Sequence, residues 1–238
     1  MKNEVTYLDP HVSGGRIEGS TTMASNGSFS AFEEGYPVWY FRGYQVDHLD
    51  EKGNPVFRDN DKNGVIDASD KAMIGKPMPD FTYGVTLAAN YKNFDLLVFG
   101  NGSVGNDVFM SYSYNHIFYP LKEIYDQRWT PDGSTNRKYA RPQLTNADKY
   151  GLSDAYIFDG SYFRIKQIQL GYTFPKKLIK HALLENVRVY ASLDNFFLFT
   201  KYPGLDPEVS STSTSGMGVD YGNYPTTKKV VFGLSVTF

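Results

Sequence analysis

The sequence contains no cysteine among its 238 residues, which excludes a disulfide framework, a thiolate metal site and a cysteine nucleophile. Charge of one sign is not in excess either, because 24 Lys and Arg residues face 26 Asp and Glu residues. Nucleic-acid-binding proteins usually carry a basic face or stripe, so we expect no nucleic-acid partner. No segment approaches the roughly 18 consecutive apolar residues of a transmembrane helix.

The first residues also lack the apolar core of a signal peptide, since they read Met1-Lys2-Asn3-Glu4-Val5-Thr6. Taken literally, this is a cytosolic start. The alternative is that the chain is an excerpt whose targeting sequence lies upstream. The strand pattern described below favours the excerpt.

Aromatic residues are abundant: 19 Tyr and 17 Phe, but only 2 Trp, make up 16% of the chain. Tyr and Phe favour strands, and amphipathic aromatic rings collect at membrane–water boundaries. With 41% hydrophobic and 21% charged residues, the composition is that of a folded chain. It indicates a β-rich protein.

Alternation of apolar and polar residues predicts the strands. In residues 81–91 the odd positions Phe81, Tyr83, Val85, Leu87, Ala89 and Tyr91 are apolar or aromatic. The same period of two appears in residues 167–174, 187–194 and 230–238, and less regularly in residues 38–47 and 94–101. Six strands are therefore expected, with a stub strand over residues 4–8.

A soluble β-sandwich would alternate in the same way. Two features favour an outer-membrane barrel instead. First, the side chains on the second face of the strands are often small and uncharged. Second, the connections differ in length: residues 91–94 and 174–187 form short turns, whereas residues 47–80, 101–161 and 200–229 are long. Short and long connections alternate, so all long ones lie on one side, as in barrels with short periplasmic turns and long extracellular loops.

Six strands are too few for a closed transport barrel, and an open sheet in lipid would leave backbone groups unpaired. The chain is therefore expected to be the closing arc of something larger. We expect residues 1–35 to form the stub strand and an irregular periplasmic-side segment. Residues 36–238 should hold the barrel strands and the extracellular loops 48–79, 102–160 and 200–228.

Several blocks of the sequence resemble the SusC/RagA-like TonB-dependent outer-membrane transporters of the Bacteroidetes. They occur in the order of that family between about residue 35 and residue 238. The matching blocks are residues 59–67 (DNDKNGVID), 74–84 (IGKPMPDFTYG), 159–166 (DGSYFRIK), 170–175 (LGYTFP), 194–195 (DN) with 199–202 (FTKY), 204–208 (GLDPE) and 220–225 (DYGNYP).

The resemblance implies an antiparallel up-and-down transmembrane barrel of about 22 strands with a plug domain upstream. It further implies outer-membrane localisation, a SusD-like surface lipoprotein partner, and energy from the TonB complex through an N-terminal part that this chain lacks. Such systems take up nutrients by importing oligosaccharides or peptides. The chain would be about the last quarter of the transporter, in contact with outer-membrane lipid.

Residues 59–70 match the ligand spacing of a 12-residue calcium loop, with a glycine, Gly64, at the sharp turn. Position 12 is Asp rather than Glu, and Pro77 and Pro79 prevent a normal exit helix. The alternative is an Asx-rich surface turn. We expect a structural calcium site with a weak affinity of roughly 10⁻⁴–10⁻³ M. Its ligands would be Asp59, Asp61, Asn63, Val65, Asp67 and Asp70.

Residues 100–105 match G-x-G-x-x-G, but no helix-forming segment follows, so a flexible strand end is expected rather than a dinucleotide site. The histidines His11, His48, His116 and His181 share no ligand spacing. Asp206 and Glu208 are expected in a turn around Pro207 rather than as a catalytic pair. No catalytic residue and no organic cofactor are predicted, so the chain should not be an enzyme.

The chain ends on an aromatic residue of an alternating strand. By the resemblance, Phe232, Leu234, Val236 and Phe238 form the signal that outer-membrane assembly machinery recognises. Residues 175–184 and 121–129 are expected to form short helices, the first periplasmic and at most marginally long enough for a membrane-surface anchor. Tyr36, Trp39, Trp129 and Tyr162 could stack on sugar rings, although such aromatics are more often packing residues.

The preferred interpretation is thus the C-terminal barrel segment of a SusC-like importer, with hydrocarbon against the Phe81 and Phe232 faces. One alternative is a soluble, calcium-dependent extracellular β binding module, which would be folded and monomeric in buffer without detergent. An outer-membrane enzyme is a second alternative. It would need a convergent nucleophile and base, which the sequence does not show.

Overall fold

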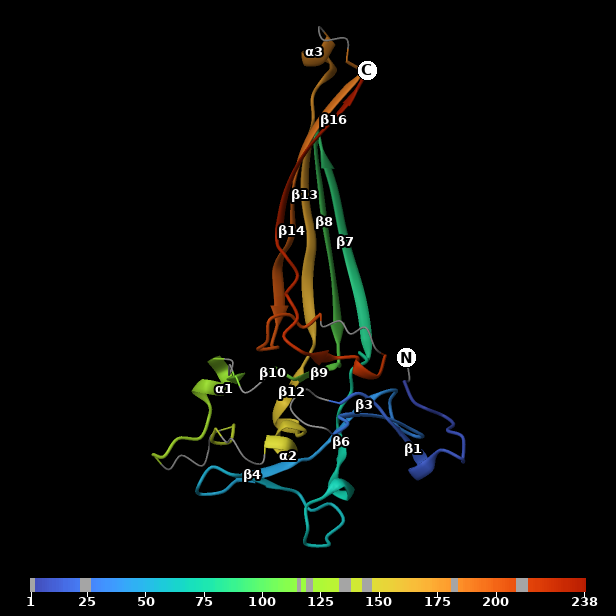
Figure 1. Ribbon diagram of the computed structural model, residues 1–238. Coiled ribbons are helices and arrows are strands. Elements are labelled where there is room, and N and C mark those ends of the chain that lie inside the picture. The colour runs from blue at the N-terminus through green and yellow to red at the C-terminus, as the bar shows by residue number, and fades with distance from the viewer. Residues whose placement is uncertain are drawn as a thin grey trace. The chain divides into compact units, whose positions relative to one another are not determined.

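The computed structural model describes residues 3–21, 27–114, 117–118, 122–132, 138–142, 147–180, 184–208 and 214–238. Strands are the main regular secondary structure of these residues, which cluster into two compact units (Figure 1). The strand unit consists of Phe81–Val104, Ser161–Thr200 and Pro225–Phe238. The connection unit consists of Met1–Asp80, Gly105–Gly160 and Lys201–Tyr224. Within the described ranges, no helix has the length and apolar character needed to span a membrane.

The strand unit is one five-stranded sheet in the order β16-β14-β13-β8-β7, and all neighbouring strands are antiparallel. A short helix, α3 (Lys176–Ile179), lies in the turn between β13 and β14. The strands are β7 (Phe81–Tyr91), β8 (Phe94–Val104), β13 (Tyr162–Thr173), β14 (Asn186–Thr200) and β16 (Lys229–Thr237).

The register of the sheet places every long connection at one end. Phe81 pairs with Val104, Tyr162 with both Ser103 and Thr200, and Asp194 with Lys229, so the three long connections start and finish there. At the opposite end Tyr91 pairs with Phe94 and Asn186 with Thr237, next to the two short turns. The expected all-β, antiparallel, up-and-down fold class is confirmed.

The sheet nevertheless contains one strand fewer than expected. Residues 38–47 do not form a barrel strand but contribute to β3 (Tyr40–Gly43) and β4 (Val46–Leu49), which lie in two other sheets. Every residue of β3 is buried, so its hydrophobicity reflects burial on both sides and not one exposed apolar face. Residues 4–8 are not a strand either. They run beside residues 35–36 through bonds between Val5 and the backbone of Gly35 and Tyr36.

The connection unit contains several small sheets. β1-β2-β3-β6 forms a four-stranded sheet, β12-β9-β15 a three-stranded one, and β4-β5 and β10-β11 form two-stranded sheets. The helical elements are short. Besides β3 and β4, the elements are η1 (Ser13–Gly15), β1 (Arg16–Glu18), β2 (Ser30–Glu33), β5 (Pro55–Phe57), η2 (Ala68–Asp70), β6 (Ala72–Gly75), β9 (Asp107–Met110), β10 (Ser113–Tyr114), β11 (Ile117–Phe118), α1 (Lys122–Asp126), α2 (Ala147–Gly151), η3 (Asp154–Tyr156), β12 (Ile157–Asp159), η5 (Thr214–Gly216) and β15 (Val219–Asp220).

One of the two hydrophobic clusters among the described residues joins the three chain segments of the connection unit. Phe29 and Phe41 from the first segment stack and tilt against Phe109 from the second, at ring-centroid distances of 5.2 and 6.0 Å. Leu152 and Val219 complete the cluster, the latter from the third segment. The long connections therefore fold together and do not behave as three separate loops. The expected boundary near residue 35 stays a prediction.

At Gly43 of β3, two of these segments approach each other closely. Tyr44 donates its backbone N–H to the backbone oxygen of Leu152 at 2.9 Å, and Asp154 donates its backbone N–H to the backbone oxygen of Tyr44 at 3.0 Å. A Cβ atom at Gly43 would overlap the backbone oxygen of Leu152 and come within 2.6 Å of Ile74 Cδ1. Only glycine allows this approach.

Replacing this glycine should loosen the connection unit. We expect Gly43→Ala to cost roughly 2–3 kcal/mol locally, because backbone rather than a flexible side chain must shift. Hydrogen exchange at the amides of Tyr44 and Asp154 should accelerate. Gly84→Ala on β7 is the matched control, since its Cβ would meet nothing closer than 3.7 Å. Unchanged exchange in the Gly43 variant would contradict the shared packing.

Candidate functional site

One face of the five-stranded sheet is apolar from edge to edge. The register brings its side chains into rows in which no residue is charged. Many are strongly exposed, for example Leu87 at 64%, Phe232 at 79% and Leu234 at 66%. The members of this apolar face are Phe81, Tyr83, Val85, Leu87, Ala89, Tyr91, Phe94, Leu96, Val98, Gly100, Gly102, Val104, Phe163, Ile165, Ile168, Leu170, Tyr172, Val187, Val189, Ala191, Leu193, Phe197, Phe199, Val230, Phe232, Leu234 and Val236.

Aromatic rings concentrate at both ends of the apolar face. At the long-connection end Tyr83 stacks on Phe163 with ring centroids 5.8 Å apart, and Phe163 lies 6.3 Å from Phe199. At the short-turn end Tyr172 contacts Phe94 at 4.7 Å and Phe174 at 5.2 Å. Most side chains between the two aromatic rows are aliphatic, apart from Phe197 and Phe232. This arrangement is that of a membrane-facing surface with two interfacial girdles.

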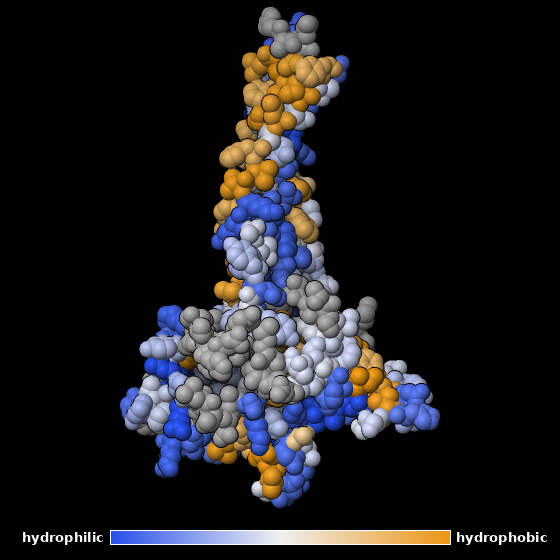
Figure 2. Space-filling view, viewed as in Figure 1, coloured by the Kyte–Doolittle hydropathy of each residue, from blue (hydrophilic) through white to orange (hydrophobic). Residues whose placement is uncertain are grey.

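The length of the strands fits a bilayer. β7 has 11 residues, which at about 3.4 Å per residue extend over about 37 Å. A tilt of about 45° reduces this to about 26 Å along the membrane normal, close to the apolar band of about 25 Å in outer-membrane barrels. Figure 2 shows hydrophobic side chains gathered on the strands near the end that carries α3 and the C-terminus.

In the aromatic row at the long-connection end, the rings of Tyr83 and Phe163 can lie over β8 because β8 has glycines at positions 100 and 102. A Cβ at Gly100 would lie 2.7 Å from the ring of Phe163, and one at Gly102 would lie 2.7 Å from the ring of Tyr83. These two glycines belong to the G-x-G-x-x-G match at residues 100–105. The expected flexible strand end is therefore corrected: β8 is regular strand through Val104, and its glycines make room for rings.

The opposite face of the sheet is largely polar. Arg188 of β14 donates to both carboxylate oxygens of Asp95 of β8, at 2.9 and 2.5 Å, and reaches across β13 above Gly171. Ser192 donates to Asp194 at 2.5 Å. A polar inner face beside an apolar outer face is the strand pattern of a barrel with a filled or aqueous interior.

Both edges of the sheet are open. β7 pairs only with β8, and β16 pairs only with β14, among the residues that the structure describes. Each open edge presents unpaired backbone groups, which hydrocarbon does not tolerate. The sheet is therefore a segment that requires further strands on both sides.

The 59–70 loop brings together three of the predicted metal ligands. One carboxylate oxygen each of Asp59, Asp61 and Asp70 lies within 4.8 Å of the others. The backbone N–H groups of Asn63 and Gly64 donate to Asp59, at 3.2 and 2.8 Å, and hold its carboxylate inward. Gly64 has φ 85°, so this sharp turn does need glycine.

The other predicted ligands play different parts in this loop. Asn63 accepts the N–H of Val65 at 2.7 Å, and the Val65 side chain is exposed. Asp67 caps η2 by accepting the N–H of Ser69 at 2.7 Å, so its carboxylate is not in the cluster.

The carboxylates of the loop have opposite electrostatic surroundings. Hydrogen bonds from the backbone N–H groups of Asp67 and Asn60, at 2.8 and 2.7 Å, lower the pKa of buried Asp70. Desolvation and the neighbouring charges of Asp70 and Asp59 raise the pKa of Asp61. A divalent cation would relieve this repulsion, so the donor set suits a hard cation that prefers oxygen ligands.

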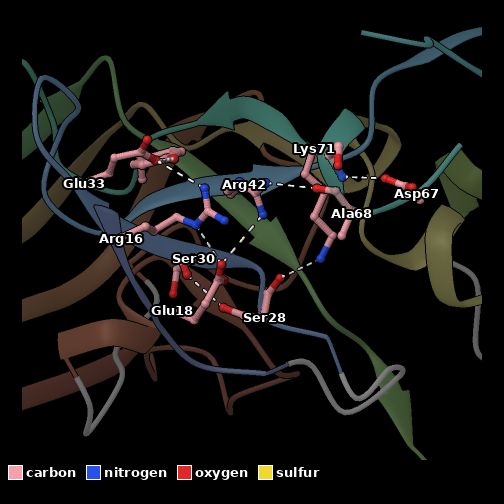
Figure 3. Close-up of polar contacts among 11 residues, drawn as sticks. Arg16, Glu18, Ser28, Ser30, Glu33, Arg42, Asp67, Ala68 and Lys71 are labelled. Carbon is pink, nitrogen blue, oxygen red and sulfur yellow. Dashed lines mark hydrogen bonds and ion pairs between the residues drawn. The ribbon is translucent and has the colours of Figure 1, made fainter. Parts of the chain in front are cut away.

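Two cations fix the end of the loop to the four-stranded sheet (Figure 3). Buried Arg42 of β3 donates to the backbone oxygen of Ala68 at 3.0 Å. Lys71 donates to the backbone oxygen of Ser28 at 3.3 Å, and burial lowers its pKa. The turn that positions Asp70 is thus anchored from outside the loop.

The aromatic candidates for substrate contact do not form one site. Tyr36 stacks on Tyr40 at 4.6 Å, and Trp39 packs against Phe32 at 5.5 Å. Trp129 lies against the Gly53 turn, where a Cβ would come within 2.8 Å of its ring. Tyr162 belongs to β13 in the strand unit. The first three rings pack within the connection unit.

A buried carboxylate that the sequence did not single out organises the third segment. Asp220 is 1% exposed and accepts the hydroxyls of Tyr112 and Tyr202, both at 2.6 Å, and the N–H of Gly222 at 2.9 Å. Burial and this carboxylate raise the pKa of Tyr112 to about 12 and raise that of Tyr202 further. Tyr202 and Asp220 lie in two of the sequence blocks that resemble the SusC/RagA-like family, 199–202 and 220–225. Their place in these blocks is the sequence signal that could have indicated the cluster.

The remaining motifs are structural. Glu208 donates its N–H to Asp206 at 3.0 Å, so these two residues form the expected turn around Pro207. The predicted helices are shorter than expected, since α1 covers Lys122–Asp126 and α3 covers Lys176–Ile179, while residues 121 and 181–183 lie outside the described residues.

The apolar face, the open edges and the topology define the class of the protein: an antiparallel strand segment of a larger transmembrane β-barrel. Comparison with known proteins agrees. The chain is 33% identical to TonB-dependent receptor P3 of Formosa agariphila over 79% of its length. It is 32% identical to the TonB-dependent receptor SusC of Bacteroides thetaiotaomicron over 99% of its length. No family model matches the chain.

The fold is also found in the RagAB peptide transporter. There the TM-score is 0.72 at 23% identity, over 99% of this chain and 25% of the other. The chain spans 19% of receptor P3 and 23% of SusC, so it corresponds to about a fifth of these relatives. It is homologous to part of the SusC-like TonB-dependent receptors, as the motif blocks predicted. These relatives are named as receptors, which agrees with the expectation that the chain is not an enzyme.

The Asp220 cluster can be tested by removing one donor. Tyr202→Phe should cost about 2 kcal/mol locally, because a buried carboxylate loses a short, charge-assisted hydrogen bond. Exchange at the amides of Phe109 and Ser111, which bond to residues 218 and 220, should accelerate by roughly 30-fold. Tyr224→Phe is the control, since Tyr224 is 87% exposed. Equal exchange in both variants would show that Asp220 does not hold this segment.

Proposed function

We propose that this chain is the C-terminal part of a TonB-dependent outer-membrane importer. In this proposal the apolar face of the strand unit contacts lipid, and the polar face lines the interior of the barrel. The three long connections are extracellular. The plug and the TonB-contacting segment belong to the part of the protein that this chain does not contain.

The observation that carries the proposal is the apolar face itself. In water its exposed Phe and Leu side chains would have no partner, and a patch of this size on a soluble monomer would promote association. This disfavours the soluble binding module. Hydrocarbon covers such a face at no cost, and each large side chain so removed from water stabilises the protein by roughly 1.5–3 kcal/mol.

We propose oligosaccharides or peptides as the imported compounds and a SusD-like surface lipoprotein as the partner of the extracellular side. The support is the homology to SusC and the fold shared with a peptide transporter. We also propose that Phe232, Leu234, Val236 and Phe238 form the assembly signal. The first three lie on the apolar face in β16, which has an open edge, and Phe238 is exposed directly after that strand.

We further propose that the 59–70 loop binds Ca²⁺ as a structural ion. The support is the convergence of Asp59, Asp61 and Asp70 within 4.8 Å and the hydrogen bonds that orient their carboxylates. Three carboxylates supply the oxygen ligands that calcium prefers. The ion would brace the loop that directly precedes β6.

The lipid-facing assignment predicts a difference between adjacent residues of β7. Leu87→Lys places a charge on the apolar face near the middle of the strand and should cost about 2–4 kcal/mol, which lowers the amount of full-length protein in the outer membrane. Thr86→Lys points to the opposite face and is the matched control. Equal amounts of both variants in the membrane fraction would contradict the assignment.

Calorimetric titration of the full-length protein tests the calcium proposal. We expect a dissociation constant of roughly 10⁻⁴–10⁻³ M, weakened about tenfold by Asp61→Asn. Glu51→Gln, which changes an exposed carboxylate outside the cluster, should leave the affinity unchanged. Absence of a calcium heat in the unmodified protein would refute the site.

A further inference from the structure

The turn between β13 and β14 carries exposed cations without carboxylate partners. Lys176, Lys177 and Lys180 are all exposed, and none makes an ion pair with any residue that the structure describes. Arg188 of the strand unit differs from them, because it forms an ion pair with Asp95. The three lysines are therefore available for an external anion.

An exposed leucine lies among these lysines. Leu178 of α3 is 68% exposed, whereas its neighbour Ile179 is 8% exposed and anchors the turn. The backbone N–H of Leu178 bonds to the oxygen of Pro175 at 2.9 Å, and that of Lys180 bonds to Lys176, so the turn has a defined shape. It presents one apolar side chain flanked by positive charges.

Along the chain, this surface follows directly on the apolar face. Tyr172 and Phe174, which form the aromatic row at the short-turn end, precede the lysines by only a few residues. Aromatic rows of this kind lie at the headgroup level of a bilayer. Cations just beyond such a row lie within reach of lipid phosphates, and long lysine side chains extend readily to them.

We propose that α3 and its lysines bind anionic phospholipid headgroups of the inner leaflet of the outer membrane, with Leu178 inserted beside the acyl chains. This inference rests on the proposed membrane location of the strand unit. The occupant is identified by charge complementarity and by continuity with the lipid-facing surface. The contact would fix the depth of the β13–β14 hairpin in the membrane.

Native mass spectrometry of the delipidated full-length transporter tests the proposal, with phosphatidylglycerol as the anionic probe and phosphatidylcholine as the zwitterionic one. Lys176→Gln combined with Lys177→Gln should weaken phosphatidylglycerol binding at least about tenfold, since each lysine near the surface contributes roughly fivefold. Phosphatidylcholine binding should not change. Leu178→Ser should weaken the binding of both lipids.

The matched control exchanges another pair of adjacent exposed lysines at the opposite end of the same sheet, Lys228→Gln with Lys229→Gln. The control should leave phosphatidylglycerol binding unchanged. Equal binding by the α3 variant and the unmodified protein, or equal losses in the α3 and control variants, would overturn the inference while the membrane assignment stands. A full-length protein that is found outside the membrane and binds neither lipid would instead refute the proposed function.

Discussion

A backbone in hydrocarbon must pair each N–H and C=O group within the protein, and this constraint governs the strand unit. The inner strands β14, β13 and β8 satisfy it through pairing on both sides, whereas β7 and β16 each keep one open edge. The sheet is consequently stable in a membrane only as part of a wider one. The same surroundings explain why the apolar face contains no charged residue while the opposite face accepts Asp95, Arg188 and Asp194.

The long connections obey a different constraint, because they must bury their own polar groups and aromatic rings without the help of lipid. They do so jointly. Phe109 packs on Phe29 and Phe41, Gly43 admits the Leu152 backbone, and Asp220 gathers the hydroxyls of Tyr112 and Tyr202. Segments far apart in sequence thus share one core, so a compound or partner that contacts them would meet a folded unit rather than flexible loops.

Much of the strand unit could be predicted from sequence, because a period of two is a local signal. β7, β13, β14 and β16 lie where the alternation was strongest. Residues 94–101 alternated weakly because Leu97 and Phe99 lie on the largely polar face while Gly100 lies on the apolar face, and the reason for Gly100 lies in a ring on the neighbouring strand. Residues 38–47 were assigned to the wrong sheet because a strand that is buried on both sides has apolar residues, as a membrane strand does. The 59–70 cluster was recognisable because its spacing is local, whereas the Asp220 cluster joins positions 112, 202 and 220.

The central claim, that lipid covers one face of the sheet, is tested most directly by nitroxide scanning. Because the chain has no cysteine, single cysteines can be introduced one by one along β7 and β16 of the full-length transporter in bilayers. Spin labels at Val85, Leu87, Phe232 and Leu234 should be accessible to oxygen and shielded from a water-soluble nickel complex, and labels at the intervening positions should show the reverse. Labels on both faces that respond alike, or an apolar face accessible to the nickel complex, would contradict the account.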